Sequence, residues 1–255
     1  MNGLKNLKNI LLSFIIVIVA WQLIIVIGDY EAALFPPPLQ VGAAIVSMIQ
    51  DGSIFEHLQV SLIRFFIGYL LSVTVAIILG LILGRMPKVW AVIDPIVQVL
   101  RPVSPIAWSP FIVLWFGIGD IPAIVIIFIA AFFPVLLSTV SAVRKIDKTY
   151  LKVAQNFEIK KSQLMWKIIF PAAFPFIANG LHIALGTAWI FLVAGEMVGA
   201  QSGLGFLIVD ARNSLSLDVV LAGIIVIGVA GLLLDKGIKW FEAWVAKQWG
   251  GQTSK

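Results

Sequence analysis

Cysteine is absent from this chain of 255 residues, and histidine occurs only twice, at His57 and His182. Without cysteine the chain can form neither a disulfide framework nor a thiolate metal site. Two histidines are too few for a histidine-rich metal site, so no metal ligands are predicted. Charged residues make up only 12% of the chain, against 60% hydrophobic residues. Because soluble domains are typically about 45–50% apolar, this composition indicates a polytopic membrane protein.

Several enzyme motifs are also missing. No stretch matches the nucleotide-binding loop G-x-x-x-x-G-K-[ST]. The chain has no nucleophile elbow and no H-E-x-x-H pair, so an intramembrane hydrolase has no candidate groups. No catalytic residue and no cofactor bound by this chain is therefore predicted, and if ATP drives the protein, another polypeptide must bind it.

The apolar residues fall into six runs, each long enough to cross a bilayer core, which takes about 17–25 residues. A signal peptide is the competing interpretation of the first run, but no small-residue cleavage site follows it, so we expect a retained helix. We predict an all-α membrane protein of six transmembrane helices, with one domain at 1–255 and a core at about 58–238. The runs are residues 10–28, 57–84, 89–117, 121–143, 170–198 and 220–236.

Lysine and arginine are distributed unevenly around these runs. With the amino terminus inside the cell, 15 of the 18 basic residues lie in cytoplasmic segments, and the exceptions are Arg64, Arg101 and Arg212. Basic residues are enriched in the cytoplasmic loops of membrane proteins. The net charge of +5 is therefore interpreted as a topology signal and not as a nucleic-acid site. We expect both termini and residues 147–171 to be cytoplasmic, with Trp240 and the rest of the tail from Lys239 polar or interfacial.

Two runs carry patterns with structural meaning. In the second run, small residues recur every four positions and permit close contact between helices; they are Gly68, Ser72, Ala76, Gly80 and Gly84. The third run contains four prolines, each of which removes a backbone donor. A broken helix is tolerated in lipid only where protein buries it or it lines a wet cavity, so we expect this run to face a transport path.

Arg101 is the charge in the third run that packing explains least. An arginine at mid-span costs about 2.5–3.5 kcal/mol on insertion scales and usually faces a cavity or a partner. Two interpretations stay open: Arg101 snorkels or pairs with Asp94, or it lines a pore for a small anion. In the second case, the other residues of the translocation path are Ser104, Trp108 and Ser109.

The fifth run and its exit loop supply the remaining candidates. Glu196 is either an outer gate or a solvated helix cap, and the cap is the favoured interpretation. Gly203 and Gly205 are expected in a loop that a soluble binding protein touches. His182 is interpreted as a helix-packing histidine, and Arg64 as a structural residue near the outer interface.

The polar stretch 147–171 separates the fourth and fifth runs. Tyr150, Ala154 and Phe157 fall at helical spacing, which predicts a short amphipathic helix whose aromatic face needs a partner; an ordinary cytoplasmic loop is the alternative. The stretch resembles the cytoplasmic signature of binding-protein-dependent ABC importer permeases, Glu-Ala-Ala, three residues, Gly, nine residues, Ile, two residues, Pro. Ala154, Ile168 and Pro171 match it, whereas Lys152, Val153 and Glu158 depart from it.

The resemblance extends over residues 35–240. LFPPP, SLIRFFIGY, LRPVSPIAWSPFIVLWFGIGD, FFPVLLSTVSAV, GLHIALGTAWIFLVAGEM and SGLGFLIVDARNSL are similar to segments of permeases of the nitrate/sulfonate/taurine ABC importers. Arg101-Pro102-Val103-Ser104-Pro105 and Leu234-Asp235 are most similar to the nitrate and bicarbonate permeases.

This resemblance implies a type I ABC importer (MetI-like) fold with a cytoplasmic coupling region at 147–168. It also implies a homodimer in the bacterial inner membrane, two ATPase subunits that bind ATP and Mg, an extracytoplasmic solute-binding protein, and a small anion as solute. The alternative is a stand-alone ion-driven carrier or channel. Such carriers usually show related broken helices in both halves, and only one clear proline-rich break is present here.

Overall fold

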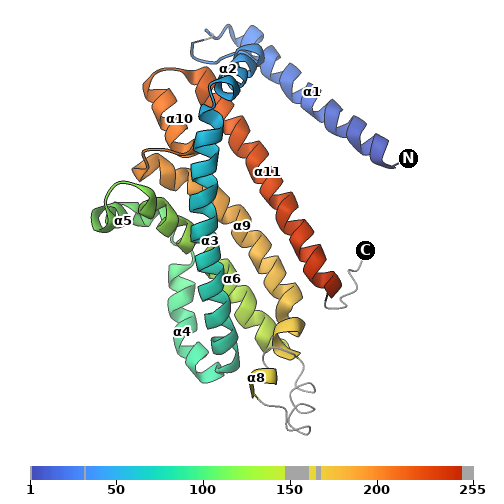
Figure 1. Ribbon diagram of the computed structural model, residues 1–255, viewed down its shortest axis with the longest axis vertical. Helices are drawn as coiled ribbons and strands as arrows, with labels where there is room; N and C mark the ends of the chain where they lie inside the picture. Colours follow the sequence, from blue (N-terminus) through green and yellow to red (C-terminus); the bar gives the residue numbers. More distant parts are fainter. Residues whose placement is uncertain (1, 32, 147–160, 165–167, 249–255) are drawn as a thin grey trace.

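The computed structural model describes residues 2–31, 33–146, 161–164 and 168–248, and these residues are almost entirely helical (Figure 1). The helices, in chain order, are α1 (Asn2–Gly28), α2 (Pro38–Gln50), α3 (Ser53–Arg85), α4 (Pro87–Leu100), the 3₁₀ turn η1 (Pro105–Trp108), α5 (Ser109–Phe116), α6 (Asp120–Arg144), α8 (Lys161–Leu164), α9 (Phe170–Gly199), α10 (Leu204–Asn213) and α11 (Leu217–Gln248).

Four of these helices are long and apolar enough to cross a membrane: α3, α6, α9 and α11. The bent pair α4 and α5 makes a fifth crossing if it counts as one span. The apolar part of α1, Leu12–Gly28, covers 17 residues, and α1 extends away from the rest of the bundle from its end near α2 (Figure 1). The all-helical fold is thus confirmed, whereas the count of six spans is only partly supported.

The contact between α3 and α6 depends on the small residues predicted to form a stripe. A Cβ atom added to Gly80 would lie 2.6 Å from Cβ of Thr139, and one added to Gly84 would lie 2.7 Å from Cβ of Val143. Real Cβ atoms do not approach so closely, so only glycine lets the two backbones meet here. Ser72 lies in the same stripe, and its hydroxyl donates to the carbonyl of Phe128.

Helix α6 is the centre of the bundle, because it packs along both α3 and α9. Its residues Ile127, Ala131 and Val135 are fully buried, as are Ile177 and Leu192 on α9. A second, smaller core joins α2 to α10 and α11 at the end of the bundle opposite α8 (Figure 1). Together the two cores hold the ends of α3, α9 and α10 in fixed relative positions.

The third predicted span is broken, as its prolines indicated. Helix α4 ends at Leu100, η1 begins at Pro105, and the two halves meet at an angle of 86°. Pro110 lies in the first turn of α5, where its missing N–H costs no helical hydrogen bond. The α5–α6 turn then uses Gly117 and Gly119, both with positive φ. The break therefore places η1 and α5 across the bundle against α6 and α9.

The last helix extends beyond the predicted sixth span. The predicted span covers about residues 220–236 and is followed by a polar or interfacial tail from Lys239, and α11 continues through this tail to Gln248. Lys239 donates to Asp235 one turn earlier, and Trp240 and Trp244 are exposed on the same continuous helix. Residues 236–248 are rich in good helix formers, which explains why the helix does not stop where hydropathy falls.

Candidate functional site

The predicted translocation residues lie at the break between α4 and α5. Arg101 follows the last residue of α4, and its side chain is exposed; Ser104 is also exposed, and Trp108 is 36% exposed. Ser109, the first residue of α5, is buried. Asp94 accepts a hydrogen bond from Gln98 at 3.3 Å and forms no ion pair with Arg101, so the pairing interpretation of Arg101 is wrong. The break thus presents one cation and one hydroxyl group at the surface of a single chain.

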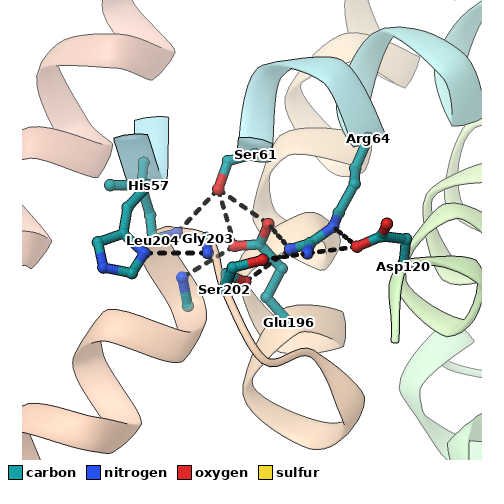
Figure 2. Close-up of polar contacts among 9 residues, drawn as sticks. His57, Ser61, Arg64, Asp120, Glu196, Ser202, Gly203 and Leu204 are labelled. Carbon is teal, nitrogen blue, oxygen red and sulfur yellow. Dashed lines mark hydrogen bonds and ion pairs between the residues drawn. The ribbon is translucent and has the colours of Figure 1, made fainter. Parts of the chain in front are cut away.

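A buried ion network lies close to this broken span (Figure 2). Arg64 on α3 donates from Nη1 to Oε1 of Glu196 on α9 at 2.8 Å, and from Nε to Oδ1 of Asp120 on α6 at 2.8 Å. Both Arg64 and Glu196 are buried, at 2% and 1% exposure, whereas the Asp120 side chain is 68% exposed. One guanidinium group therefore connects three helices and reaches the surface through Asp120.

The same network caps the first turn of α10. The backbone N–H of Gly205 donates to Oε2 of Glu196 at 2.9 Å, and that of Leu204 donates to the Ser61 hydroxyl at 2.8 Å. The N–H of Gly203 donates to Nδ1 of His57 at 3.1 Å. The first N–H groups of a helix have no partner within the helix, so these side chains supply acceptors that α10 lacks. Ser61 also donates to the Glu196 carboxylate (Figure 2).

Backbone contacts connect the two turns on either side of the network. The N–H of Gly119, in the α5–α6 turn, donates to the carbonyl of Gly199 at the end of α9. Arg64 donates from Nη1 to the Ser202 carbonyl at 2.6 Å and from Nη2 to the Ser202 hydroxyl at 2.7 Å. The turn that follows the broken span and the turn before α10 are therefore held together.

Burial excludes the favoured sequence interpretation of Glu196. A solvated cap would be exposed, but this carboxylate accepts hydrogen bonds from Ser61, Arg64 and Gly205 inside the bundle. Gly203 and Gly205 are buried with it, and a side chain on either glycine would collide with Glu196. Arg64 is buried with them.

Sequence reasoning missed Ser61, Asp120 and Ser202 as partners of this network. The available signal was the presence of two opposite charges, Arg64 and Glu196, inside apolar runs. Charged residues within membrane helices usually pair with one another. Nothing in the helical periodicity indicated that residues 132 positions apart would be these partners.

The predicted coupling residues Lys152, Val153, Ala154, Phe157 and Glu158 lie outside the described residues. Ile168 and Pro171 are within them, and both are partly buried at the start of α9. Ile168 packs against the main core. Ile168, the described end of the predicted coupling region, therefore joins the bundle at the start of α9, the helix that carries Glu196 at its other end.

Comparison with known proteins identifies the family. Residues 72–247 match the family model described as binding-protein-dependent transport system inner membrane component. The putative aliphatic sulfonates transport permease protein of Bacillus subtilis is 36% identical over 92% of this chain and 85% of that protein. The taurine transport system permease protein of Escherichia coli is 34% identical over 88% of this chain and 83% of that protein. The nitrate import permease protein of Synechocystis is 32% identical over 90% of this chain and 86% of that protein.

A solved structure supports the same fold. A chain from inward-facing conformations of the MetNI methionine ABC transporter superposes with a TM-score of 0.52 at 22% identity, covering 73% of this chain and 94% of that chain. This likeness extends to the backbone fold, and the family model covers most of the described bundle. The chain belongs to the family of binding-protein-dependent transport system inner membrane components, the permease subunits of ABC importers.

Proposed function

We propose that two copies of this chain form the path by which a small anion enters the cell across the bacterial cytoplasmic membrane. The names of its relatives point to sulfonates, taurine and nitrate as solutes, and bicarbonate belongs to the same chemical class. Both termini and residues 147–168 face the cytoplasm in this proposal. An extracytoplasmic solute-binding protein delivers the anion to the opposite end, near the α9–α10 turn.

The observation that carries the proposal is the cation at the broken span. Arg101 is exposed at the 86° break between α4 and α5, where Ser104 and Trp108 are also exposed. Among the described residues, none forms an ion pair with Arg101. A broken helix with free polar groups provides backbone and side-chain contacts for an ion within the membrane. Arg101, Ser104, Trp108 and Ser109 are the residues proposed to line the path.

Two further parts complete the proposed mechanism. Two cytoplasmic ATPase subunits bind ATP and Mg and bind the coupling region, where Phe157 makes the apolar contact with the ATPase. Their closure moves residues 147–168, and α9 transmits the movement as a rigid body toward Glu196, Gly203 and Gly205. Before this closure, the Arg64–Glu196 network forms the closed outer gate, because it joins the turns on both sides of the path, and the closure opens it to the outside.

Uptake by the purified complex in proteoliposomes tests the proposal. Labelled taurine, nitrate, an alkanesulfonate and bicarbonate should each be offered with and without internal ATP and with and without the solute-binding protein. The proposal requires uptake of one of these anions only when both are present. Uptake by this chain alone, without any ATPase, would indicate an ion-driven carrier or a channel instead.

A further inference from the structure

The ends of α3 and α6 lie side by side at the end of the bundle near α8 (Figure 1). The two helices run in the same direction, and their contacts join residues 56 positions apart, as in the hydrogen bond from Ser72 to the Phe128 carbonyl. The same register continues toward the helix ends, because a Cβ atom added to Gly84 would lie 3.3 Å from the carbonyl oxygen of Val140. Arg85, the last residue of α3, is therefore level with the last turn of α6.

This register brings together four basic residues, which we call the basic cluster: Arg85, Lys88, Arg144 and Lys145. Arg144 and Lys145 lie within one turn of the level of Arg85, or about 6 Å along the helix axis. Lys88 follows three residues after Arg85, in the first turn of α4. All four side chains are exposed. The basic cluster therefore presents four positive charges at one end of the bundle.

No ion pair neutralises the basic cluster within the part of the chain that the structure describes. Every ion pair among those residues involves other side chains. The sequence contains no acidic residue at 57–93 or at 121–146. Lys145 lies over the ring of Phe176, 5.6 Å from its centroid, a contact that leaves the lysine charge uncompensated. Because like charges this close repel one another, an anion from outside the chain is the complement that the basic cluster lacks.

The basic cluster lies at the level of a membrane surface. Between Arg64 and Arg85, α3 has 20 residues without a charged side chain. At 1.5 Å per residue they extend over about 30 Å, which is the thickness of the hydrocarbon core of a bilayer. Arg64, at one boundary, bonds within the protein to Asp120 and Glu196. Arg85, at the other boundary, is exposed at the depth of the lipid headgroups.

An exposed apolar stripe on α3 leads from the basic cluster into the membrane. Leu71, Ile78 and Ile82 are 53%, 52% and 47% exposed. They precede Arg85 at helical spacings of seven, four and three residues, so the four side chains share one face of the helix. Leu71 is about 21 Å from Arg85 along the axis, and one leaflet contributes about 15 Å of hydrocarbon. An acyl chain therefore has an apolar contact along its whole length while its headgroup reaches Arg85.

We propose that the basic cluster binds the headgroup phosphate of an anionic phospholipid, with Arg85 and Arg144 as its main contacts and the α3 stripe along an acyl chain. Arginine binds phosphate through two parallel hydrogen bonds. Anionic lipid surfaces attract each nearby Lys or Arg by the equivalent of about fivefold in affinity. A lipid fits better than a soluble protein because the cations continue directly into a stripe at hydrocarbon depth. With residues 147–168 in the cytoplasm, as proposed, the lipid belongs to the cytoplasmic leaflet, but its binding does not depend on which anion the protein carries.

Native mass spectrometry of the full chain in detergent tests the site directly. The protein is equilibrated with equal amounts of dioleoylphosphatidylglycerol and dioleoylphosphatidylcholine, which share their acyl chains and differ in headgroup charge. We expect phosphatidylglycerol to be retained at least about fivefold over phosphatidylcholine, and this preference to fall as the ammonium acetate concentration rises. Equal retention of the two lipids would overturn the proposal. Loss of the preference when inorganic phosphate is added at the lipid concentration would also overturn it, because that result indicates a site for a free anion.

Charge-removing variants locate the lipid on the chain. Arg85→Gln/Arg144→Gln should bring the retention ratio of the two lipids close to one. Arg212→Gln/Lys236→Gln removes two exposed charges outside the basic cluster and should keep the preference. If the first double variant does not fold, Arg144→Gln alone should lower the ratio severalfold.

Co-purification separates the lipid site from a contact with the ATPase. The Arg85→Gln/Arg144→Gln variant should still recover the ATPase subunit in equal amount, because the basic cluster contacts lipid in this proposal. A variant that keeps its preference for phosphatidylglycerol but loses the ATPase subunit would assign the basic cluster to the interface with the ATPase and overturn the lipid site.

Discussion

Arg64 and Glu196, which are 132 residues apart in the chain, form an ion pair of 2.8 Å in which both side chains are buried. The pair connects the first half of α3 to the last turn of α9, and the Glu196 carboxylate also accepts from the first turn of α10. This contact fixes the positions of three helix ends. Its removal should therefore affect this end of the bundle specifically.

Replacing Arg64 by Gln should destabilise the protein strongly. The change leaves the Glu196 carboxylate buried without its cation, and breaking a buried pair in this way typically costs about 3–5 kcal/mol. Thermal unfolding in detergent measures the loss. Asp120→Asn is the matched control, because Asp120 is the exposed partner of the same guanidinium and should cost far less. Equal stability of the two variants would contradict the role assigned to the buried pair.

The packing of α3 on α6 predicts opposite effects for two Gly→Ala changes. Gly80→Ala adds a methyl group 2.6 Å from Cβ of Thr139, and such overpacking costs about 1–3 kcal/mol. Gly186→Ala adds the same group to α9 where nothing lies within 4 Å, and it should be neutral or stabilising by up to about 1 kcal/mol through helix propensity. Unfolding midpoints of both variants in one detergent make the comparison, and a stable Gly80→Ala protein would show that α3 and α6 do not pack this closely.

Arg101→Gln should reduce anion uptake without preventing assembly with the ATPase subunits. The expected loss is at least about tenfold, since a factor of ten corresponds to only about 1.4 kcal/mol of lost stabilisation of the passing anion. Uptake in proteoliposomes and the ATPase content of the purified complex are measured together. Arg212→Gln, at an exposed arginine near the end of α10, is the control. Normal uptake in Arg101→Gln would remove this arginine from the translocation path.

The helices of this protein were largely predictable from its sequence, because apolar runs and small-residue spacing are local patterns. The expected run 121–143 corresponds to α6 at Asp120–Arg144, and the stripe that includes Gly80 makes the predicted close helix contact, with α6 as its partner. The prolines likewise indicated the break before α5. Local patterns do not report which distant side chains meet. Glu196 was for this reason assigned to the solvated surface, although Arg64, Ser61 and the start of α10 enclose it.

The end of α11 shows a second limit of sequence patterns, because hydropathy does not fix where a helix ends. Hydropathy falls after Lys236, where the predicted span ends, but hydropathy reports the membrane environment and not the backbone conformation. Lysine, glutamate and alanine favour helix, and the Lys239–Asp235 contact adds an i,i+4 pair. The helix therefore continues through the lipid boundary to Gln248.

Co-purification of the tagged chain from its native membrane in mild detergent, followed by mass spectrometry, tests the central claim most directly. We expect a nucleotide-binding subunit to be recovered in equal amount with this chain. The Phe157→Asp variant should insert normally but lose that subunit, because the proposed aromatic contact with the ATPase would become a charge. Recovery of this chain alone, together with transport after reconstitution without an ATPase, would contradict the assignment of an importer subunit driven by a partner.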